Sequence, residues 1–485
     1  MSKSIALLLV LVFLSASCLV MPQSVKASSK TIVVPDDYPT IASAAGNALD
    51  GDTVFVKTGH YEGPQNQTLF INKTISLIGE DPEGTIINLH PPLVPMNIFT
   101  YEYMGYLSAI KIDADWVKLS GFTITSDGGD LSATGNGIQI IGNDMSFRVS
   151  ATGDGTQILS NTLTGISLKG SYQTIAQNNV LEGYAEFLIS CVGSYNTITS
   201  NRVSGSAGGI YTNGSYNIIH GNSVTAESGI SAGVEVDGSE NILYSNNISN
   251  FVCIGSTYAP ESSSNTICGN TIENNLIIVG NSNTFNANYF QGIVLGNRIQ
   301  DASNNIFYHN NFDFVENEVW FGGEKVFTVW QGVLGSISLD NGKEGNYYSD
   351  YNGSDLNADG VGDTPYVIIT TDPNNYHNVA IDNIADMTLT DHYPLMTPFD
   401  ISSVTMELPE WEYTPPPPSP TPTPSPEPTP SPSATPTPIP SKTPPSTPEP
   451  QSIEPSQTTL AATAAGATTA IIIVGLLVFF KKRKG

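Results

Sequence analysis

Carboxylate and amide side chains near the end of the globular part are spaced like the ligands of a calcium loop. Hard oxygen donors at alternate residues can surround one Ca²⁺ ion, and an EF-hand-type loop takes them at places 1, 3, 5, 7 and 9. Gly360 stands at place 6, where that loop turns sharply, but Tyr366 replaces the usual carboxylate at place 12. The sequence therefore predicts a weak calcium site, with a metal-free Asp/Gly-rich turn as the alternative. The predicted ligands are Asp355, Asn357, Asp359, Val361 (through its carbonyl) and Asp363.

A second group of carboxylates lies in the middle of the chain. Glu235, Asp237 and Glu240 form the densest acidic group between residues 156 and 312. Because Val234 and Val236 alternate with the first two, Glu235 and Asp237 are expected to point outward from one strand. Paired carboxylates can act as general acid and base, flank a sugar or bind a cation. A solvated acidic face is the simpler interpretation, so these three are catalytic candidates only, and the catalytic residues stay unassigned.

The elements that would position these groups are repeats. Residues 156–312 contain one pattern eight times: a polar residue, an apolar residue two on, an Asn five on and an apolar residue seven on. Successive copies of the Asn lie 17 to 24 residues apart, a period that indicates a solenoid. The first position is Asn in six copies, with Thr156 and Gln173 as exceptions. The repeated Asn residues are Asn161, Asn178, Asn201, Asn222, Asn246, Asn270, Asn288 and Asn310.

Short runs that alternate with period two, such as Ile166 and Leu168, indicate strands rather than helices. Each coil then has about three short strands that pair in parallel with the next coil. Parallel crossovers are almost always right-handed. We expect each repeated Asn to adopt the left-handed bend itself and to stack with its neighbours in a hydrogen-bonded ladder. The predicted fold is all-β, a right-handed parallel β-helix with an apolar interior.

The two ends of the predicted ectodomain differ from the repeats. Pro39 and Thr40 begin a short helix with an apolar stripe of Ile41, Ala44, Ala45, Ala48 and Leu49, which is expected to cap the open first coil. Residues 88–107 contain three prolines and predict a loop that leaves the wall. We expect first coils over 30–150, Asn-ladder repeats over 156–312 and a closing segment over 313–400, all within an ectodomain of residues 28–413.

The remaining segments predict an exported, membrane-attached protein. Residues 1–27 resemble a signal peptide; a lipoprotein signal on Cys18 and an uncleaved anchor are the alternatives. Residues 414–458 form a stalk rich in Pro, Ser and Thr, and residues 461–480 are apolar enough for one transmembrane helix. The basic tail 481–485 stays cytoplasmic by the positive-inside rule. The ectodomain is therefore expected at the cell surface.

Charge excludes one class of partner. Between the signal and the tail lie all 45 acidic residues and 12 basic ones, since two of the 18 basic residues fall in the first 27 positions and four in the last five. A nucleic-acid binder needs a basic face, so nucleic acid is excluded as a partner.

Three cysteines lie in the predicted ectodomain. Cys191 continues an inward alternation, and Cys253 and Cys268 either pair or stay free.

The repeated Asn-x-Ile-x-x-Asn-x-Val pattern, with Gly51-Asp52-Thr53-Val54, resembles the NosD-type parallel β-helix family of the pectate-lyase-like superfamily. The segments 345–351, 359–366 and 393–396 are similar to the closing segment of archaeal cell-surface members. The resemblance covers roughly residues 30–400. It implies the β-helix fold, and it raises two activities: maturation of a copper site, as in the family's named member, and polysaccharide cleavage, as in the superfamily's enzymes.

Copper needs clustered imidazole, thiolate or thioether ligands. The histidines are scattered, so we do not expect copper: they are His60, His90, His220, His309, His377 and His392.

Five sequons are candidate N-glycosylation sites in an exported chain: Asn66, Asn72, Asn213, Asn247 and Asn352.

Two classes of function stay open from the sequence. The first is a non-catalytic surface protein whose wall binds polysaccharide or another envelope glycan or protein. The second is a polysaccharide lyase or glycoside hydrolase. A lyase needs an Arg or Lys base, and the cations between residues 156 and 312 are Lys169, Arg202 and Arg298, in different coils. The sequence therefore favours the binding protein.

Overall fold

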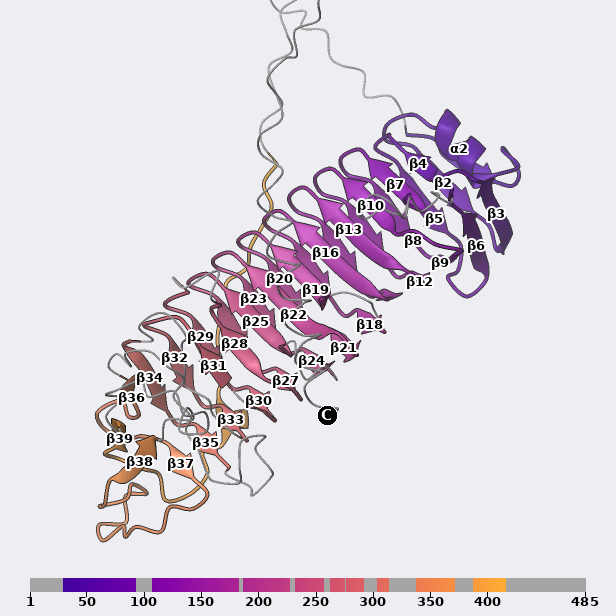
Figure 1. The fold of residues 1–485 in the computed structure, drawn as a ribbon. Coiled ribbons are helices and arrows are strands. Elements are labelled where there is room, and N and C mark those ends of the chain that lie inside the picture. The colour runs from indigo at the N-terminus through magenta and orange to yellow at the C-terminus, as the bar shows by residue number, and fades with distance from the viewer. Residues whose placement is uncertain are drawn as a thin grey trace, which may run out of the picture. The chain divides into compact units, whose positions relative to one another are not determined.

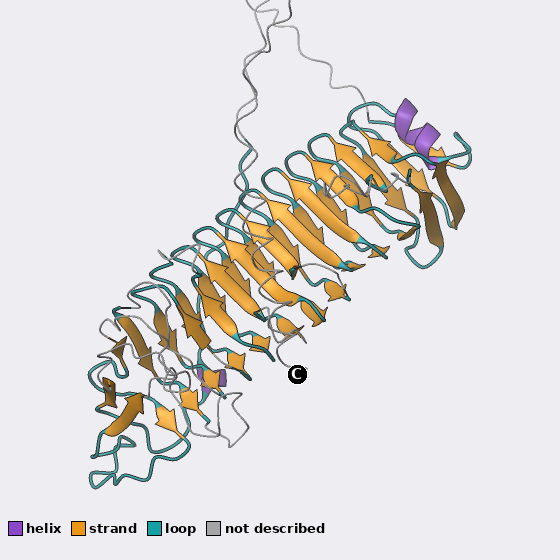
Figure 2. Cartoon of the chain, in the orientation of Figure 1, coloured by secondary structure: helices purple, strands orange, loops and turns teal. Residues whose placement is uncertain are grey.

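Short alternating runs form strands that stack in parallel from one coil to the next, as the sequence predicts (Figure 1). The computed structural model describes residues 29–92, 107–182, 186–226, 232–256, 262–274, 276–291, 303–313, 337–370 and 387–415. Within them, three parallel sheets wind into a right-handed solenoid of about 11 turns. Strands and loops make up nearly all of it (Figure 2).

The three sheets, here named A, B and C, form the walls in turn. In the described residues, sheet A has 14 strands, sheet B 13 and sheet C 10. The strands of sheet A are β1 (Thr31–Val34), β2 (Thr53–Val56), β5 (Ser76–Gly79), β8 (Lys118–Ser120), β11 (Gln139–Ile141), β14 (Gln157–Leu159), β17 (Thr174–Ala176), β20 (Thr197–Thr199), β23 (Ile218–His220), β26 (Ile242–Tyr244), β29 (Thr266–Cys268), β32 (Thr284–Asn286), β34 (Asn305–Tyr308) and β36 (Ile337–Ser338). Those of sheet B are β3 (Gly59–Gln65), β6 (Thr85–His90), β9 (Thr123–Ser126), β12 (Asp144–Met145), β15 (Thr162–Leu163), β18 (Asn179–Leu181), β21 (Arg202–Gly205), β24 (Ser223–Ala226), β27 (Asn247–Ile248), β30 (Thr271–Ile272), β33 (Tyr289–Phe290), β35 (Asn311–Phe312) and β37 (Tyr347–Tyr348). Those of sheet C are β4 (Leu69–Ile71), β7 (Ile110–Asp113), β10 (Leu131–Thr134), β13 (Arg148–Thr152), β16 (Gly165–Lys169), β19 (Phe187–Val192), β22 (Gly208–Asn213), β25 (Val234–Asp237), β28 (Val252–Ile254) and β31 (Leu276–Ile278).

The interior is apolar and stacked in rows. Both apolar positions of every repeat are buried, at 0 or 1% exposure, so the sequence pattern located the core correctly. Burying one such Ile or Leu side chain contributes roughly 1.5–3 kcal/mol. Aliphatic rows end in aromatic ones at the last coils, where Phe285 stacks on Phe307 with ring centroids 4.3 Å apart. Tyr348 closes the neighbouring row and is fully buried.

The repeated Asn residues form the predicted ladder. Each side-chain N–H donates to the side-chain oxygen of the next at 2.9–3.1 Å. The ladder extends one coil beyond the predicted copies at each end, to Asn143 and to Asn346. One expectation was wrong: the left-handed bend is made by the preceding residue, for example Ser160 (φ 54°) and Ser200 (φ 55°). The Asn that follows turns its amide inward, where Asn161, for example, donates to the Leu159 carbonyl and to Asn178.

A second ladder stands at the corner between sheets C and A. It is built from the first position of the repeat, where the backbone N–H of Asn196 donates to the side-chain oxygen of Asn217 at 3.0 Å. The residue before each member again has positive φ, and at this corner several of those residues are aromatic. Tyr172, Tyr195 and Tyr216 stack with centroids 5.2 and 5.1 Å apart.

Helix α2 (Ile41–Asn47) forms where the sequence predicts it. Thr40 is its N-cap, because its side chain accepts a hydrogen bond from the Ser43 N–H at 3.1 Å. Ile41, Ala44 and Ala45 are buried, and the helix contacts β1 to β4. Leu49 was wrongly placed in the apolar stripe, since it lies beyond the helix and is 66% exposed.

Residues 397–415, here named the strap, run back along the solenoid after its last coil. At the near end, Asn311 and Phe399 exchange two hydrogen bonds of 2.8 Å between side chain and backbone, and the Phe399 ring stacks on His309. Further back, the Tyr244 hydroxyl donates to the Val404 carbonyl at 2.9 Å. The short 3₁₀ helix η2 (Ile401–Ser403) lies between these contacts.

The far end of the strap reaches the aromatic corner. Trp411 meets Tyr195 edge-on with centroids 5.2 Å apart, and Tyr413 packs against Trp116 at 5.8 Å and Tyr172 at 6.3 Å. The strap therefore crosses several coils on the sheet A side. The sequence predicts residues 397–413 as ectodomain and 414–415 as the start of the stalk, but it does not predict this packing.

The closing segment ends in the antiparallel pair β38 (Tyr366–Thr370) and β39 (Met387–Asp391). Among the described residues, no helix is both long and apolar enough to cross a membrane. The predicted signal peptide, most of the stalk and the predicted transmembrane segment 461–480 lie outside the described residues, as do residues 93–106 of the predicted loop.

Candidate functional site

One row of outward side chains follows the register of sheet C from strand to strand, and it is here named the sheet C row. Its centre is four consecutive serines, followed at one end by Tyr211 and at the other by Lys111 and then Phe70. With strands about 4.8 Å apart, the six steps from Phe70 to Tyr211 span roughly 29 Å. The members in order are Phe70, Lys111, Ser132, Ser150, Ser167, Ser190, Tyr211, Glu235, Cys253 and Ile277.

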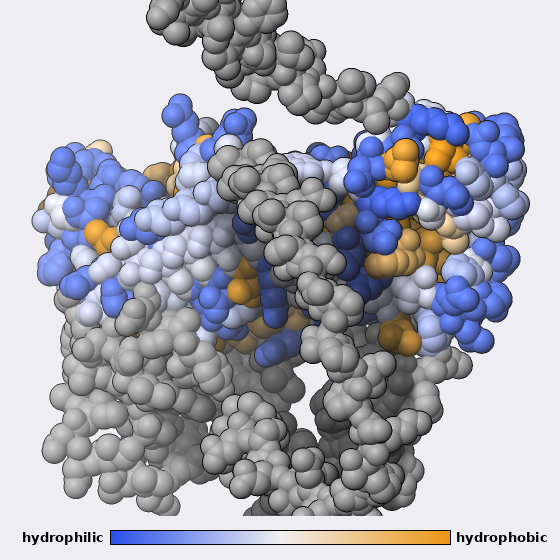
Figure 3. All heavy atoms as spheres, turned by 90° about the horizontal axis from the view of Figure 1, so that it is seen from above, coloured by the Kyte–Doolittle hydropathy of each residue, from blue (hydrophilic) through white to orange (hydrophobic). Residues whose placement is uncertain are grey.

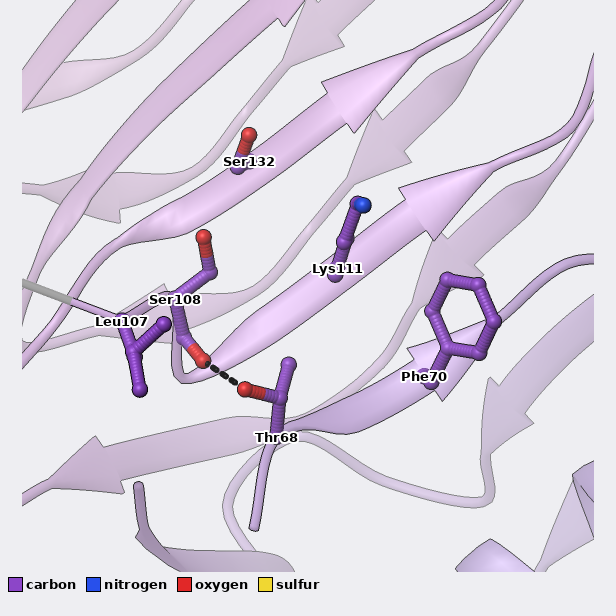
Figure 4. A pocket seen from close by; sticks show the side chains of 6 residues that line it. All are labelled: Thr68, Phe70, Leu107, Ser108, Lys111 and Ser132. Carbon is purple, nitrogen blue, oxygen red and sulfur yellow. Dashed lines mark hydrogen bonds between the residues drawn. The ribbon is translucent and has the colours of Figure 1, made fainter. Parts of the chain in front are cut away.

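The N-terminal end of this row is hollowed. A cavity of about 400 Å³ is lined by Thr68, Phe70, Leu107, Ser108, Lys111 and Ser132. Figure 4 shows the Phe70, Lys111 and Ser132 side chains on three adjacent strands, rising on the same side of the sheet. The Lys111 ammonium lies 5.7 Å from the Phe70 ring centroid, a cation–π contact.

The other end of the row is acidic and partly buried. Asp237 is 2% exposed; one carboxylate oxygen accepts hydrogen bonds from the Tyr211 hydroxyl at 3.2 Å and the Ser256 hydroxyl at 3.0 Å. Its other oxygen, Oδ1, is buried and has no hydrogen-bond partner in the described residues. An unpaired buried carboxylate oxygen is costly, so this atom is suited to a ligand that donates a hydrogen bond. Asn213 donates to the Tyr211 hydroxyl at 3.0 Å and completes the group.

Glu235 stands beside Asp237 on β25, and burial raises its pKa to about 7, with the negative charges of Asp237 and Glu186 adding to the effect. Burial also raises the pKa of Asp237, although the Ser256 and Tyr211 hydroxyls oppose that shift. Burial raises the pKa of the neighbouring Cys253 thiol as well, so this thiol stays protonated. The pKa values of both carboxyl groups, Glu235 and Asp237, are therefore raised.

The third acidic candidate is not part of this group. Glu240 lies after β25 at the corner between sheets C and A, exposed and with φ of 59°. It occupies the corner position that Tyr216 holds one coil earlier. The structure therefore brings Glu235 and Asp237 together and leaves Glu240 apart.

The predicted calcium loop is an exposed turn held by its own backbone. The two carboxylate oxygens of Asp355 accept from the N–H groups of Asp359 at 3.2 Å and Gly360 at 2.9 Å. Asp363 accepts from the Leu356 N–H at 2.7 Å, so the loop is closed across its base. In the part of the chain that the structure describes, no three His, Cys, Asp or Glu side chains meet as a metal site. Calcium binding stays a prediction.

The three ectodomain cysteines are free. Cys191 is buried in the core, as its alternation predicts. Cys253 faces outward on sheet C and Cys268 faces outward on sheet A, so the pairing that the sequence left open is not formed. All five sequon asparagines are exposed, and Asn213 lies on sheet C beside Asp237.

Among the coloured residues of the face drawn in Figure 3, most are hydrophilic or near neutral, and the hydrophobic ones lie in separate groups.

Comparison with known proteins gives the family of this fold. Residues 108–286, from β7 to β32, match the family model described as periplasmic copper-binding protein (NosD). This part of the chain is a NosD-type β-helix. No curated protein sequence matches the chain.

Three solved structures align with parts of this chain. The Dettilon tailspike protein gp208 aligns with a TM-score of 0.40 and 16% identity, over 58% of this chain and 66% of that chain. The Streptococcus pneumoniae surface protein and adhesin PfbA aligns at 0.33 and 12%, over 64% and 92%. Geobacillus virus E2 ORF18 aligns at 0.28 and 11%, over 70% and 65%.

The donors of the NosD-type β-helix do not fit the copper of the family description. His90 bonds through both ring nitrogens to the carboxylates of Glu62 and Asp127, at 2.8 and 2.6 Å. His309 bonds to Glu344 at 2.7 Å, on another coil. Cys253 and Cys268 face outward on different sheets, so the described soft donors do not converge on one ion. We derive no copper chemistry from this arrangement.

Sequence reasoning missed the sheet C row because its register is a tertiary property. Alternation in each strand identified outward positions, but the varied spacing of the repeats hid which positions align. The signal available was weak: Ser132, Ser150, Ser167 and Ser190 each follow a buried aliphatic residue on their strand.

Proposed function

We propose that this protein is a cell-surface β-helix that binds a glycan along the outer face of sheet C without cleaving it. The observation that carries the proposal is the sheet C row: a flat floor of hydroxyls between the rings of Phe70 and Tyr211. Aromatic rings offer flat apolar surfaces for sugar rings, and hydroxyls and carboxylates bond to sugar hydroxyls.

The acidic end adds a second support. The unpaired Oδ1 of Asp237 is a buried acceptor on the same face, and a sugar hydroxyl is a donor that would satisfy it. Tyr211 and Asn213 keep the carboxylate oriented through their hydrogen bonds. These groups are fixed on strands rather than on loops, which suits a preformed binding face.

The stiffness of the β-helix wall also supports glycan binding. Stacked coils and two Asn ladders hold the row in register, so little conformational freedom is lost when a chain binds. The proposal includes the setting predicted from sequence: an exported ectodomain, a stalk over residues 414–458 and a membrane helix over 461–480. Helix α2 is proposed to cover the open first coil.

The test is a glycan-binding screen with the full-length protein and a variant that blocks the floor. Ser150→Trp places a large ring at the centre of the row and is expected to abolish binding. Thr162→Trp is the matched control, because Thr162 also faces outward in the same coil but on sheet B. Equal binding by both variants would mean that the glycan does not lie on sheet C.

Hydrolysis is the second candidate, and Glu235 is the observation that favours it. A carboxyl group with a pKa of about 7 is partly protonated at neutral pH, as a general acid must be. A glycosidase also needs a carboxylate that stays ionised, yet burial raises the pKa of Asp237 too. On sheet C, Lys169 is in register with Val192, Asn213 and Asp237 on successive strands, so Lys169 lies three strands from Asp237, roughly 14 Å. Among the described residues, this row therefore brings no lyase base beside the pair.

Release of products from a glycan panel decides between the two candidates. We expect none from the wild-type protein. Product release that is lost in both Glu235→Gln and Asp237→Asn would replace binding with hydrolysis as the function.

A further inference from the structure

The cavity at the start of the sheet C row has the chemistry of a subsite for an anionic group. Its volume of about 400 Å³ falls within the range of small-ligand pockets. Among the described residues, its lining includes a single charged side chain, Lys111, together with an aromatic ring and three hydroxyl-bearing residues, Thr68, Ser108 and Ser132.

Lys111 is available to a ligand. Among the described residues it takes part in no ion pair, and its ammonium rests 5.7 Å from the centroid of the Phe70 ring. Phe70 itself is 45% exposed, so one ring borders both the cation and open space. The Thr68 hydroxyl donates to the Ser108 carbonyl at 2.6 Å and ties the two sides of the rim together (Figure 4).

The two charged members of the sheet C row differ in sign, since Lys111 stands near its N-terminal end and Glu235 near its other end. Lys111, Arg148 and Lys169 lie on β7, β13 and β16, whereas Glu235 and Asp237 lie on β25. Asp113 and Asp130 are acidic residues near the Phe70 end, and neither lines the cavity. An anionic sugar would be repelled by the Glu235 end and attracted to Lys111.

We propose that the Phe70–Lys111 cavity binds a sugar residue that carries an anionic group, a carboxylate or a sulfate. This rests on the proposed glycan binding and adds the class of glycan and its direction on the wall. The sugar ring packs on Phe70, its anionic group meets the Lys111 ammonium, and the neutral part of the chain continues over the serines. The acidic unit is thereby fixed at the N-terminal end of the row.

The experiment compares matched oligosaccharides on the full-length protein by calorimetry. The probes are a hyaluronan hexasaccharide, the same hexasaccharide with its carboxyl groups reduced, and chondroitin hexasaccharides with and without sulfate. We expect the wild-type protein to bind the carboxylate form about five to ten times more tightly than the reduced form, as one partly exposed charge contact permits. This difference should shrink at high salt.

Substitutions then assign the difference to the cavity. Lys111→Gln is expected to lower affinity for the anionic hexasaccharides about fivefold to tenfold and to leave the reduced form unchanged, and Lys111→Arg should restore the difference. Lys118→Gln is the matched control, because Lys118 belongs to the same coil but to sheet A. A larger gain from sulfate than from carboxylate identifies sulfate as the group recognised.

Equal affinity for carboxylate and reduced forms, or a loss of both forms in Lys111→Gln with an unchanged melting temperature, overturns the anionic subsite. If Ser150→Trp still blocks the neutral glycan in that case, glycan binding on sheet C stands and only the subsite falls. If no glycan is blocked by Ser150→Trp, the proposed function itself fails.

Discussion

The carboxylate of Asp391 accepts a hydrogen bond of 2.7 Å from the backbone N–H of Asn346, the last residue of the Asn ladder. The same oxygen accepts from the Tyr348 hydroxyl at 3.0 Å, and Asp391 is fully buried. A ladder of amides would otherwise end with unpaired donors inside the closing segment. Asp391 therefore joins β39 to the last coil and terminates the ladder.

This position makes stability depend on pH. Burial raises the pKa of Asp391 to about 6, against about 4 in an unfolded chain. Between these values Asp391 binds more protons in the folded protein than in the unfolded one, so the stability that Asp391 contributes falls as pH rises from about 4 to 6 and is constant above. A pKa difference of two units between the folded and unfolded protein corresponds to about 3 kcal/mol of unfolding free energy. We expect Asp391→Asn to flatten this slope in urea unfolding measured across that window.

The exposed Asp144→Asn on sheet B is the control and should keep the wild-type slope. Glu235 contributes a slope of the same sign up to about pH 7, so Glu235→Gln should reduce the slope that Asp391→Asn leaves. Parallel slopes in Asp391→Asn and the wild type would contradict the assignment.

Replacing one Asn of the ladder is expected to lower the free energy of unfolding substantially. Asn201 donates to the Ile175 carbonyl at 2.9 Å and accepts from the N–H of Asn178 at 2.9 Å, all within the interior. Asn201→Ala leaves these buried groups unpaired, and we expect a loss of about 3–5 kcal/mol in the free energy of unfolding. Asn247→Ala, at an exposed strand position, should cost less than about 0.5 kcal/mol. Similar losses in both would mean that the ladder contributes little.

We expect the strap to become sensitive to proteases when the side chains that hold it against the coils are removed. Trp411→Ala deletes the ring that meets Tyr195, and Asn311→Ala deletes the paired hydrogen bonds to Phe399. We expect each substitution to speed proteolytic cleavage within residues 397–415. Limited proteolysis with detection of the fragments by mass spectrometry measures the rate. Glu412→Ala, an exposed neighbour, should leave the rate unchanged. Cleavage at the wild-type rate in both anchor variants would show that the strap does not depend on these contacts.

The closing turn predicts weak calcium binding. Asp355, Asp359 and Asp363 keep the spacing of an EF-hand-type loop, and the turn is already folded by its own hydrogen bonds. We expect a calorimetric signal with a Kd on the order of 10⁻⁴–10⁻³ M, as in extracellular modules. Asp359→Ala should abolish it and Asp144→Ala should not. Absence of heat in the wild-type protein would retire calcium as a ligand.

A sequon lies on the proposed binding face and gives a further test. Asn213 is exposed on sheet C and donates to the Tyr211 hydroxyl. A glycan attached there would occupy the acidic end of the row, so glycosylated protein is expected to bind added glycan less well than Ser215→Ala produced in the same host, which removes the sequon and keeps Asn213. The same comparison at Asn247, which lies on sheet B, should show no difference.

The sequence by itself determined the repeat, the strand type and the core. The two apolar positions around each Asn, three before it and two after it, fall on two consecutive strands, and every one of them is buried. The ladder followed because identical residues at a fixed place in each coil must stack. Even so, the left-handed residue was assigned one place too late, since a local pattern does not say which of two adjacent residues makes the bend.

Only the tertiary structure decided which outward residues act together. Ser132 and Ser190 belong to different coils, and coils of unequal length hide their alignment until strand register is known. The same holds for Glu240, whose nearness in sequence to Asp237 suggested one acidic group until the corner of the wall separated them. Asp391 and Trp411 reach their partners through closing and strap segments that no repeat predicts. Local periodicity sets each strand, whereas contacts between distant segments depend on how the coils stack.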